Sequence, residues 1–408
     1  MTIGIELAPH RRVFASFMMY AIAMGSIFPR LPDIKAAMGV EEGALGLALI
    51  GAPLGTLLAL TFATPLIERV GYRRGLLGSI PLIAVAYALA VQTSSPVLFF
   101  LWLIPAGFLI GCTEIIINVE ADRTEALLGK RIMNRAHAFW SIGFFTAGLL
   151  GAVMAHLGVS PQWHLGLIVP LSILVVALCL GRFTPAPLRG SNATAAAPRF
   201  ALPTTPILLL VAVTFSAMLM EGAGLDWSAI YMVDLFNSGP FMAGFAVATL
   251  AFTQAVCRWF ADGVIEKHSP RLVGRSLLIC LAIGVLLLFF PIAPGLALLG
   301  FALVGIGTSA IFPMAMSAAA QRTDRSAAIN VAALAQISFV AFLLGPPLLG
   351  FAAEHLGIQW VYGLGLPLII LSLLTVKALG DKPQTTSTMA PDPIESTDSH
   401  GKEKKGSA

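Results

Sequence analysis

The sequence predicts an all-α protein that crosses a membrane twelve times, in two pseudo-symmetric halves of six helices each. The first reason is composition, because 57% of the 408 residues are hydrophobic and only 11% are charged, whereas soluble domains carry about 25% charge. The second is the length of the apolar runs, which match the roughly 17–25 residues that cross a bilayer. The third is an internal repeat with an offset of about half the chain.

Polar or Gly- and Pro-rich segments separate the apolar runs. We expect the spans at residues 13–32, 44–66, 74–93, 97–121, 136–156, 164–181, 207–229, 241–262, 273–291, 295–318, 329–352 and 360–379. The first run follows Arg11 and Arg12 and has no convincing small-residue cleavage site after it. It is therefore predicted to remain as the first span rather than to be removed as a signal.

A decapeptide that occurs twice reveals the repeat. LLGAVMAHLG at 149–158 returns as LLGFAAEHLG at 348–357, with six of ten positions identical at an offset of 199. The tripeptide that starts at Arg123 and the one that starts at Arg322 keep the same offset. Chance similarity would not bring neighbouring segments along in register, so the sequence indicates a duplication.

The duplication predicts the domain organisation. We expect an N-terminal half at 1–181, a Pro-, Ala- and Thr-rich linker at 182–206 and a C-terminal half at 207–380. Residues 381–408 are rich in Ser, Thr, Pro and charge, and they are predicted to form a disordered tail.

The distribution of basic residues predicts the orientation. Of the 25 Lys and Arg residues, only Arg30 and Lys35 lie on one side and Arg258 lies within a span; the other 22 fall on the side of both termini or in the linker. Because cytoplasmic loops carry the excess of Lys and Arg, both termini and the linker are predicted to be cytoplasmic.

The segment after the second span carries the most specific motif. It reads TPLIERVGYRR at 64–74 and resembles the loop signature of the major facilitator superfamily, roughly G-x-L-x-D-R-x-G-R-R. Arg69, Gly71 and Arg73 fit this signature, Glu68 replaces its Asp, and Thr64 replaces its first Gly. Three longer stretches, at 29–55, 221–231 and 312–357, resemble a bacterial branch that includes rhizopine-linked transporters and inner-membrane facilitators of poorly known substrate.

The resemblance implies two functional regions. In the superfamily the motif carboxylate, here Glu68, pairs with a basic residue that ends the fourth span, here Arg123. The two residues would then form a conformational latch together with Arg69, Gly71 and Arg73. The resemblance also implies that spans 1, 4, 7 and 10 line a central cavity, so polar residues on these spans are the first candidates for binding solute or protons.

Three polar residues stand within the cavity spans. Glu114 and Asn118 are four positions apart on the fourth span and share one helix face. Glu221 lies on the seventh span between apolar neighbours and close to two glycines. Because an ionisable group inside a span is costly to insert, we interpret them as binding or proton-coupling residues, with Glu221 as first choice for the proton carrier and Glu114 as second. The alternative is that each is satisfied by a neighbouring polar group and only fixes packing.

Other polar residues lie near the ends of spans. Arg30 and Asp226 sit on equivalent spans of the two halves and suggest an ion pair at the outer gate, or else Arg30 pairs locally with Asp33. Trp227 is a candidate for stacking on solute. Arg258 is expected in a charge network at the inner face rather than in the cavity.

These observations predict a secondary transporter that moves a sugar, polyol or related small metabolite across the cell inner membrane, with proton coupling through its buried carboxylates. An efflux facilitator for drugs or metabolites and a non-transporting membrane sensor are the alternatives. We expect a monomer in the lipid bilayer that is not an enzyme and has no cofactor, metal site or nucleic-acid partner, since the four cysteines lack metal-site spacing and no P-loop is present.

Overall fold

The computed structural model describes residues 5–130, 132–187 and 201–380. Within these residues the chain is helical and has no strand. The elements run in the order α1 (Pro9–Gly25), η1 (Phe28–Arg30), α2 (Leu31–Met38), α3 (Glu42–Leu49), α4 (Gly51–Phe62), α5 (Thr64–Val70), α6 (Tyr72–Ala90), α7 (Pro96–Leu128), α8 (Met133–His156), α9 (Pro161–Leu180), α10 (Thr205–Phe236), α11 (Pro240–Lys267), α12 (Pro270–Phe289), α13 (Pro294–Thr308), α14 (Ile311–Ala320), α15 (Ala327–Ser338), α16 (Val340–Leu356), α17 (Trp360–Gly363), α18 (Gly365–Thr375) and η2 (Val376–Leu379).

Twelve segments of the described chain are long and apolar enough to cross a membrane. The predicted all-α fold with twelve spans is therefore confirmed, although several boundaries move. The fourth span continues to Leu128, beyond the predicted end at 121. The second span stops at Phe62, because Pro65 has no amide hydrogen to continue the ladder and the short helix α5 begins instead.

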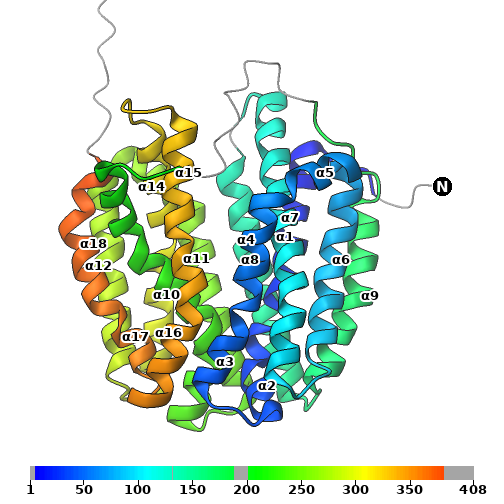
Figure 1. Ribbon diagram of the computed structural model, residues 1–408, viewed down its shortest axis with the longest axis vertical. Coiled ribbons are helices and arrows are strands. Elements are labelled where there is room, and N and C mark those ends of the chain that lie inside the picture. Colours follow the sequence, from blue (N-terminus) through cyan, green and yellow to red (C-terminus); the bar gives the residue numbers. More distant parts are fainter. Residues whose placement is uncertain (1–4, 131, 188–200, 381–408) are drawn as a thin grey trace, which may run out of the picture.

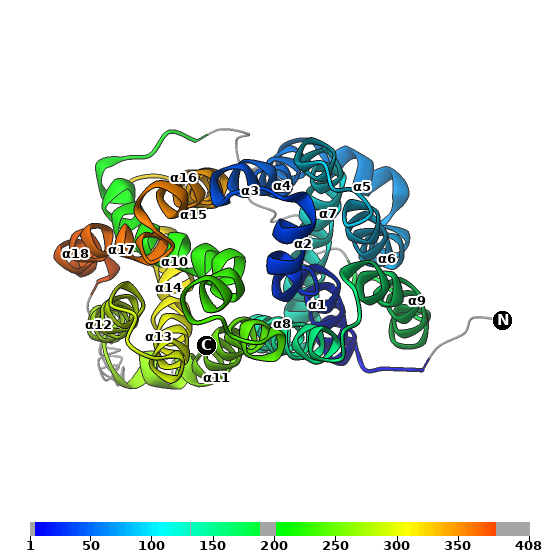
Figure 2. The ribbon, with the colours of Figure 1, turned by 90° about the horizontal axis from the view of Figure 1, so that it is seen from below.

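The helices form two groups. Figure 2 shows helices from α1 to α9 mainly on one side and helices from α10 to α18 mainly on the other. We call the face that holds the start of α1 and the end of η2 the terminal face, and the face that holds α2 and α17 the far face; they are the upper and lower ends in Figure 1. The predicted tail at 381–408 and most of the predicted linker lie outside the described residues.

Small residues bring the two groups together towards the far face. A methyl group added to Gly46 on α3 would lie 3.2 Å from the Cα atom of Gly350 on α16. A methyl group added to Gly244 on α11 would lie 2.8 Å from the Cα atom of Ala152 on α8. Because such contacts leave no room for a side chain, glycine is needed at both helix crossings.

The tenth span is broken in its middle. Helix α13 ends at Thr308 and α14 begins at Ile311. Pro313 has no amide hydrogen, so it cannot donate to the carbonyl of Ser309 four residues earlier. The break therefore leaves the Ser309 carbonyl without a helical partner and available to another group.

The described ends of the linker are attached to the helical groups. The Glu120 side chain accepts a hydrogen bond of 3.1 Å from the Ala186 amide, and the Gln336 side chain accepts one of 3.1 Å from the Ala201 amide. Close to the second attachment, Asn330 donates a hydrogen bond of 2.9 Å to Asp324. This hydrogen bond lowers the pKa of the exposed Asp324 carboxyl below its usual value.

Candidate functional site

A cavity of about 2540 Å³ lies between the two helical groups. Its lining extends to Pro65, Glu266 and Gln321 near the terminal face. At its deep end the lining includes Phe28 and Leu49, close to the segments that meet at the far face. The molecule is thus open at the terminal face and packed shut at the far face.

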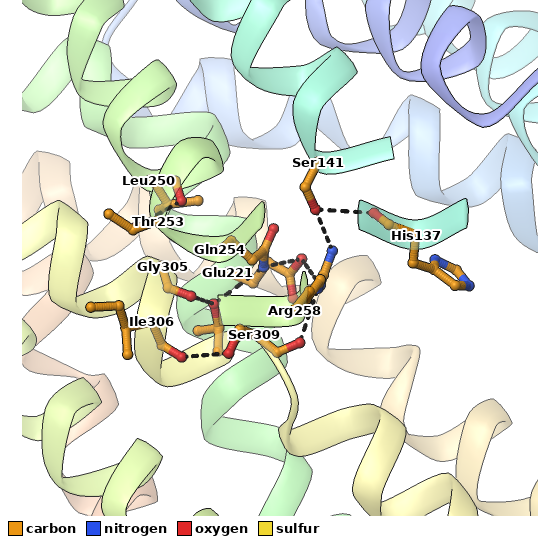
Figure 3. Close-up of polar contacts among 11 residues, drawn as sticks. His137, Ser141, Glu221, Leu250, Thr253, Gln254, Arg258, Gly305, Ile306 and Ser309 are labelled. Carbon is orange, nitrogen blue, oxygen red and sulfur yellow. Dashed lines mark hydrogen bonds and ion pairs between the residues drawn. The ribbon is translucent and has the colours of Figure 1, made fainter. Parts of the chain in front are cut away.

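Glu221 on α10 has partners from the neighbouring helix α11. Gln254 donates a hydrogen bond of 2.8 Å from Nε2 to Glu221 Oε1, and Arg258 Nη2 lies 3.3 Å from the same oxygen. The side chains of Glu221 and Arg258 are only 14% and 15% exposed. Figure 3 shows this group of polar contacts. The carboxylate is therefore held by a cation that the sequence around Glu221 does not reveal.

Arg258 also connects three helices. Its Nε donates a hydrogen bond of 2.9 Å to the carbonyl of Ser309, and its Nη1 donates one of 3.0 Å to Ser141 Oγ on α8 (Figure 3). Its guanidinium lies 5.7 Å from the centre of the Trp140 ring. The expectation that Arg258 belongs to a network at the inner face is wrong, because the free carbonyl at the break in the tenth span and the Glu221 carboxylate draw the guanidinium into the cavity wall.

Glu114 and Asn118 lie together on α7, as their spacing predicts. Asn118 Nδ2 donates to Glu114 Oε2 at 3.1 Å and to the Glu114 carbonyl at 2.9 Å. The Tyr20 hydroxyl on α1 is a second hydrogen-bond partner of the carboxyl. All three residues line the cavity. Within the described residues, no basic group pairs with Glu114.

The candidates near the far face lie apart from one another. Arg30 pairs with Asp33 at 2.8 Å and donates a hydrogen bond of 2.7 Å to the Val159 carbonyl. It therefore forms the local ion pair with Asp33 and not the ion pair with Asp226. Asp226 lines the cavity without a hydrogen bond or ion pair to any described residue. Trp227 is completely buried and does not line the cavity, so its ring is placed for packing rather than for stacking on solute.

A charged contact that sequence reasoning missed closes the far face. Lys35 on α2 contacts Glu42 at the start of α3 and lies 3.3 Å from Asp234 near the end of α10. In addition, the Gly43 amide donates a hydrogen bond of 3.0 Å to Glu354 on α16. We call Lys35, Glu42 and Asp234 the far-face gate. One sequence signal could have identified it, since Lys35 and Asp234 are 199 positions apart, which is the offset of the repeat.

The predicted latch residues lie at the terminal face. Arg123 lies 3.7 Å from Glu120 and 4.3 Å from the centre of the Tyr72 ring, and Arg73 donates a hydrogen bond of 2.5 Å to the Gly181 carbonyl. Gly71 has φ +85°, a conformation that favours glycine. Glu68 and Arg69 are exposed. Among the described residues no ion pair joins Glu68 to Arg123 while this face is open.

Solved transporter structures share the fold of this chain. A mutant of the nucleoside transporter NupG superimposes with a TM-score of 0.71 at 13% identity, over 91% of this chain and 99% of that one. A bacterial homologue of the human lysosomal transporter Spinster, in an inward-facing and occupied conformation, gives 0.67 at 16% identity, over 92% and 97%. A mutant of the E. coli fucose:proton symporter FucP gives 0.59 at 15% identity, over 91% and 98%. At these identities the likeness shows a shared fold.

Two curated relatives match most of the chain. An uncharacterized MFS-type transporter of Yersinia pestis is 29% identical over 370 residues, which cover 89% of this chain and 92% of the relative. Membrane protein MosC of Rhizobium meliloti is 24% identical over 363 residues, 87% of each. The sequence model of the Major Facilitator Superfamily matches residues 13–339 and 236–396. The chain therefore belongs to the Major Facilitator Superfamily of membrane transporters.

Proposed function

We propose that the protein moves a small polar solute, such as a sugar, a polyol or a related metabolite, across the inner membrane by proton-coupled alternating access. The observation that carries this proposal is a large cavity that is lined by partly buried carboxylates, is open at one face and is closed at the other. The structural likeness to NupG, a nucleoside transporter, and to FucP, a fucose:proton symporter, supports the class of solute and the coupling.

The proposal includes an orientation. We propose that the terminal face is cytoplasmic, because the basic residues favour it, and that the molecule is in an inward-open conformation. The likeness to an inward-facing Spinster homologue supports this assignment. Alternating access would then require the far-face gate to open while the latch around Glu68 and Arg123 closes. We also propose that the two moving bodies are the halves 1–181 and 207–380, within a monomer.

The contacts of the carboxylates change the order of the proton-carrier candidates. Arg258 compensates the charge of Glu221, which removes the reason for placing Glu221 first. Within the part of the chain that the structure describes, Glu114 is held only by the neutral partners Asn118 and Tyr20. A carboxyl without a cationic partner gains and loses a proton at a smaller electrostatic cost than one held in an ion pair. We therefore propose Glu114 as the proton carrier and the Glu221–Arg258 pair as part of the solute-binding wall.

The test begins with a thermal-shift screen of the purified protein against a metabolite library to identify the solute. Counterflow and pH-driven accumulation of that solute are then measured in proteoliposomes for the wild type, Glu114→Gln and the control Glu41→Gln, which removes an exposed carboxylate outside the cavity. We expect Glu114→Gln to retain counterflow, because exchange requires no net proton release, and to lose accumulation. Accumulation by Glu114→Gln at the wild-type level and with the same pH dependence would exclude Glu114 as the carrier.

A further inference from the structure

The deep part of the cavity contains more acidic than basic groups. Among the described residues, Glu114, Glu221 and Asp226 on α7 and α10 line it, and the basic lining residues near them are Arg258 and His137, which lies one helical turn before the Arg258 partner Ser141. Arg258 is already engaged with Glu221, Ser141 and the Ser309 carbonyl. Glu114 and Asp226 therefore face the cavity without an ion-pair partner among the described residues. An uncompensated charge within a span is costly, so each of them favours a proton or a positively charged ligand.

Asp226 and Tyr87 are two polar residues of this surface without a hydrogen-bonding or ionic partner among the described residues. Asp226 on α10 lines the cavity and has no hydrogen-bonding or ionic partner among the described residues. Tyr87 on α6 is only 2% exposed, yet it also lines the cavity, and no described residue is hydrogen-bonded to its hydroxyl. A partly buried carboxyl and a buried tyrosine from opposite helical groups thus line the same cavity.

We propose that Asp226 and Tyr87 bind a protonated amino group of the solute, so that the transported molecule is a small organic cation. This inference rests on the proposed transport function and specifies the charge of its solute. The Asp226 carboxylate accepts a charge-assisted hydrogen bond from the ammonium group. The Tyr87 hydroxyl accepts a further hydrogen bond from it, and aromatic rings favour a neighbouring cation. The remaining hydroxyl groups of such a solute would face Asn118 and the Glu114 carboxyl.

The first experiment compares probes that differ by a charged nitrogen. Thermal stabilisation of the purified protein is measured with meglumine against sorbitol and with ethanolamine against ethylene glycol, for the wild type, Asp226→Asn and the control Glu41→Gln. We expect the amines to stabilise the wild type and Glu41→Gln more than their neutral counterparts do, and we expect Asp226→Asn to lose the difference. Stabilisation of the wild type by a neutral probe equal to that by its amine counterpart, or a difference that survives in Asp226→Asn, would overturn the proposal.

The second experiment requires no knowledge of the solute. Gly222 lies one helical turn before Asp226 and lines the cavity, and a methyl group added there has its nearest neighbour at 3.5 Å, so cysteine fits. In Gly222→Cys, the rates of labelling by the cationic reagent MTSEA and the anionic reagent MTSES are measured, with the protein that lacks this substitution as blank. We expect the ratio of the MTSEA rate to the MTSES rate to be about tenfold higher than the ratio of their intrinsic reactivities, because a charged cleft raises the local concentration of counter-ions. Adding Asp226→Asn should reduce this preference.

These labelling rates decide the outcome if neither amine stabilises the wild type. A ratio equal to the intrinsic ratio, or one that Asp226→Asn leaves unchanged, would overturn the proposal. Labelling does not depend on transport, so its result separates the charge of the site from the transport function. Accumulation of a neutral solute by Asp226→Asn at the wild-type level would disprove the cationic solute while leaving the transporter proposal intact.

Discussion

Lys35 and Asp234 lie 3.3 Å apart at the far face, and they occupy positions separated by the offset of the internal repeat. Corresponding ends of the first and seventh spans thus carry opposite charges that meet where the two helical groups touch. Glu42 also contacts Lys35, so the lysine bridges one acidic residue in each group. The ion pair is partly buried, with 17% of the Lys35 side chain and 30% of the Asp234 side chain exposed. A duplicated sequence has therefore acquired a complementary contact at its pseudo-symmetric interface.

The first prediction concerns this far-face gate. Lys35→Gln removes the bridging charge, which should destabilise the closed far face by about 1 kcal/mol. The ratio of closed to open molecules should then fall about fivefold. Spin labels at the exposed Ala37 and His355 report the separation of the two groups at this face. We expect Lys35→Gln to increase the long-distance population and Glu41→Gln to leave it unchanged. Identical distance distributions in Lys35→Gln and the wild type would show that the gate does not hold this face closed.

The second prediction concerns close packing at the same face. In Gly46→Ala the new methyl group would meet the carbonyl of Pro346, so the closed far face should be disfavoured. Gly166→Ala on α9 is the matched control, because a methyl group there has no neighbour within 4 Å. We expect the same spin labels to report opening in Gly46→Ala and no change in Gly166→Ala. If both variants retain the wild-type distances, the crossing of α3 and α16 tolerates a side chain and does not require glycine.

The third prediction concerns the latch at the terminal face. Glu68 and Arg123 are apart in the open state, so their attraction should contribute only when this face closes. Glu68→Gln and Arg123→Gln should each favour the open state, by about 1 kcal/mol for a charge near a helix end. Accessibility of a cysteine introduced at Ser317, which lines the cavity, should rise from this side. Unchanged labelling rates in both variants would mean that these residues form no latch.

The fourth prediction concerns the Glu221–Arg258 pair. Arg258→Gln leaves the Glu221 carboxylate and the Ser309 carbonyl without their charged partner, and it should lower the free energy of unfolding by about 3 kcal/mol. Adding Glu221→Gln removes the unpaired charge and should recover part of this loss. Thermal unfolding of the wild type, the two single variants and the double variant in detergent gives the coupling energy. Strictly additive effects would contradict a direct interaction between the two side chains.

The sequence predicted the spans well because membrane-spanning length and hydrophobicity are properties of continuous segments. Helix breaks were harder to place, although Pro313 is four positions after the carbonyl that it leaves free. The pairing of Glu114 with Asn118 could be predicted because both lie on one helix face. The pairing of Glu221 with Arg258 could not, since it depends on how α10 and α11 pack and on the bond of Arg258 to Ser309.

The ion pair at the outer gate was also only partly predictable from the sequence. The repeat indicated that the first and seventh spans would meet, and Arg30 with Asp226 was the pair expected there. Arg30 instead has a nearer partner in Asp33, three residues away in α2. Lys35 and Asp234, located further towards the ends of these segments, make the contact. The internal repeat thus identified the two helices that meet at the far face. Which of their residues form the ion pair depends on the direction in which each side chain points.

Solute-dependent proton movement in proteoliposomes tests the central claim most directly. Vesicles that contain the protein and a trapped pH-sensitive dye receive the solute found by the thermal-shift screen, with no imposed pH gradient. We predict that a solute gradient changes the internal pH in the wild type and in Glu41→Gln, and that Glu114→Gln carries the solute without this change. Solute movement with no pH change in the wild type would contradict proton coupling, and the absence of movement of any solute that binds would contradict the transport function itself.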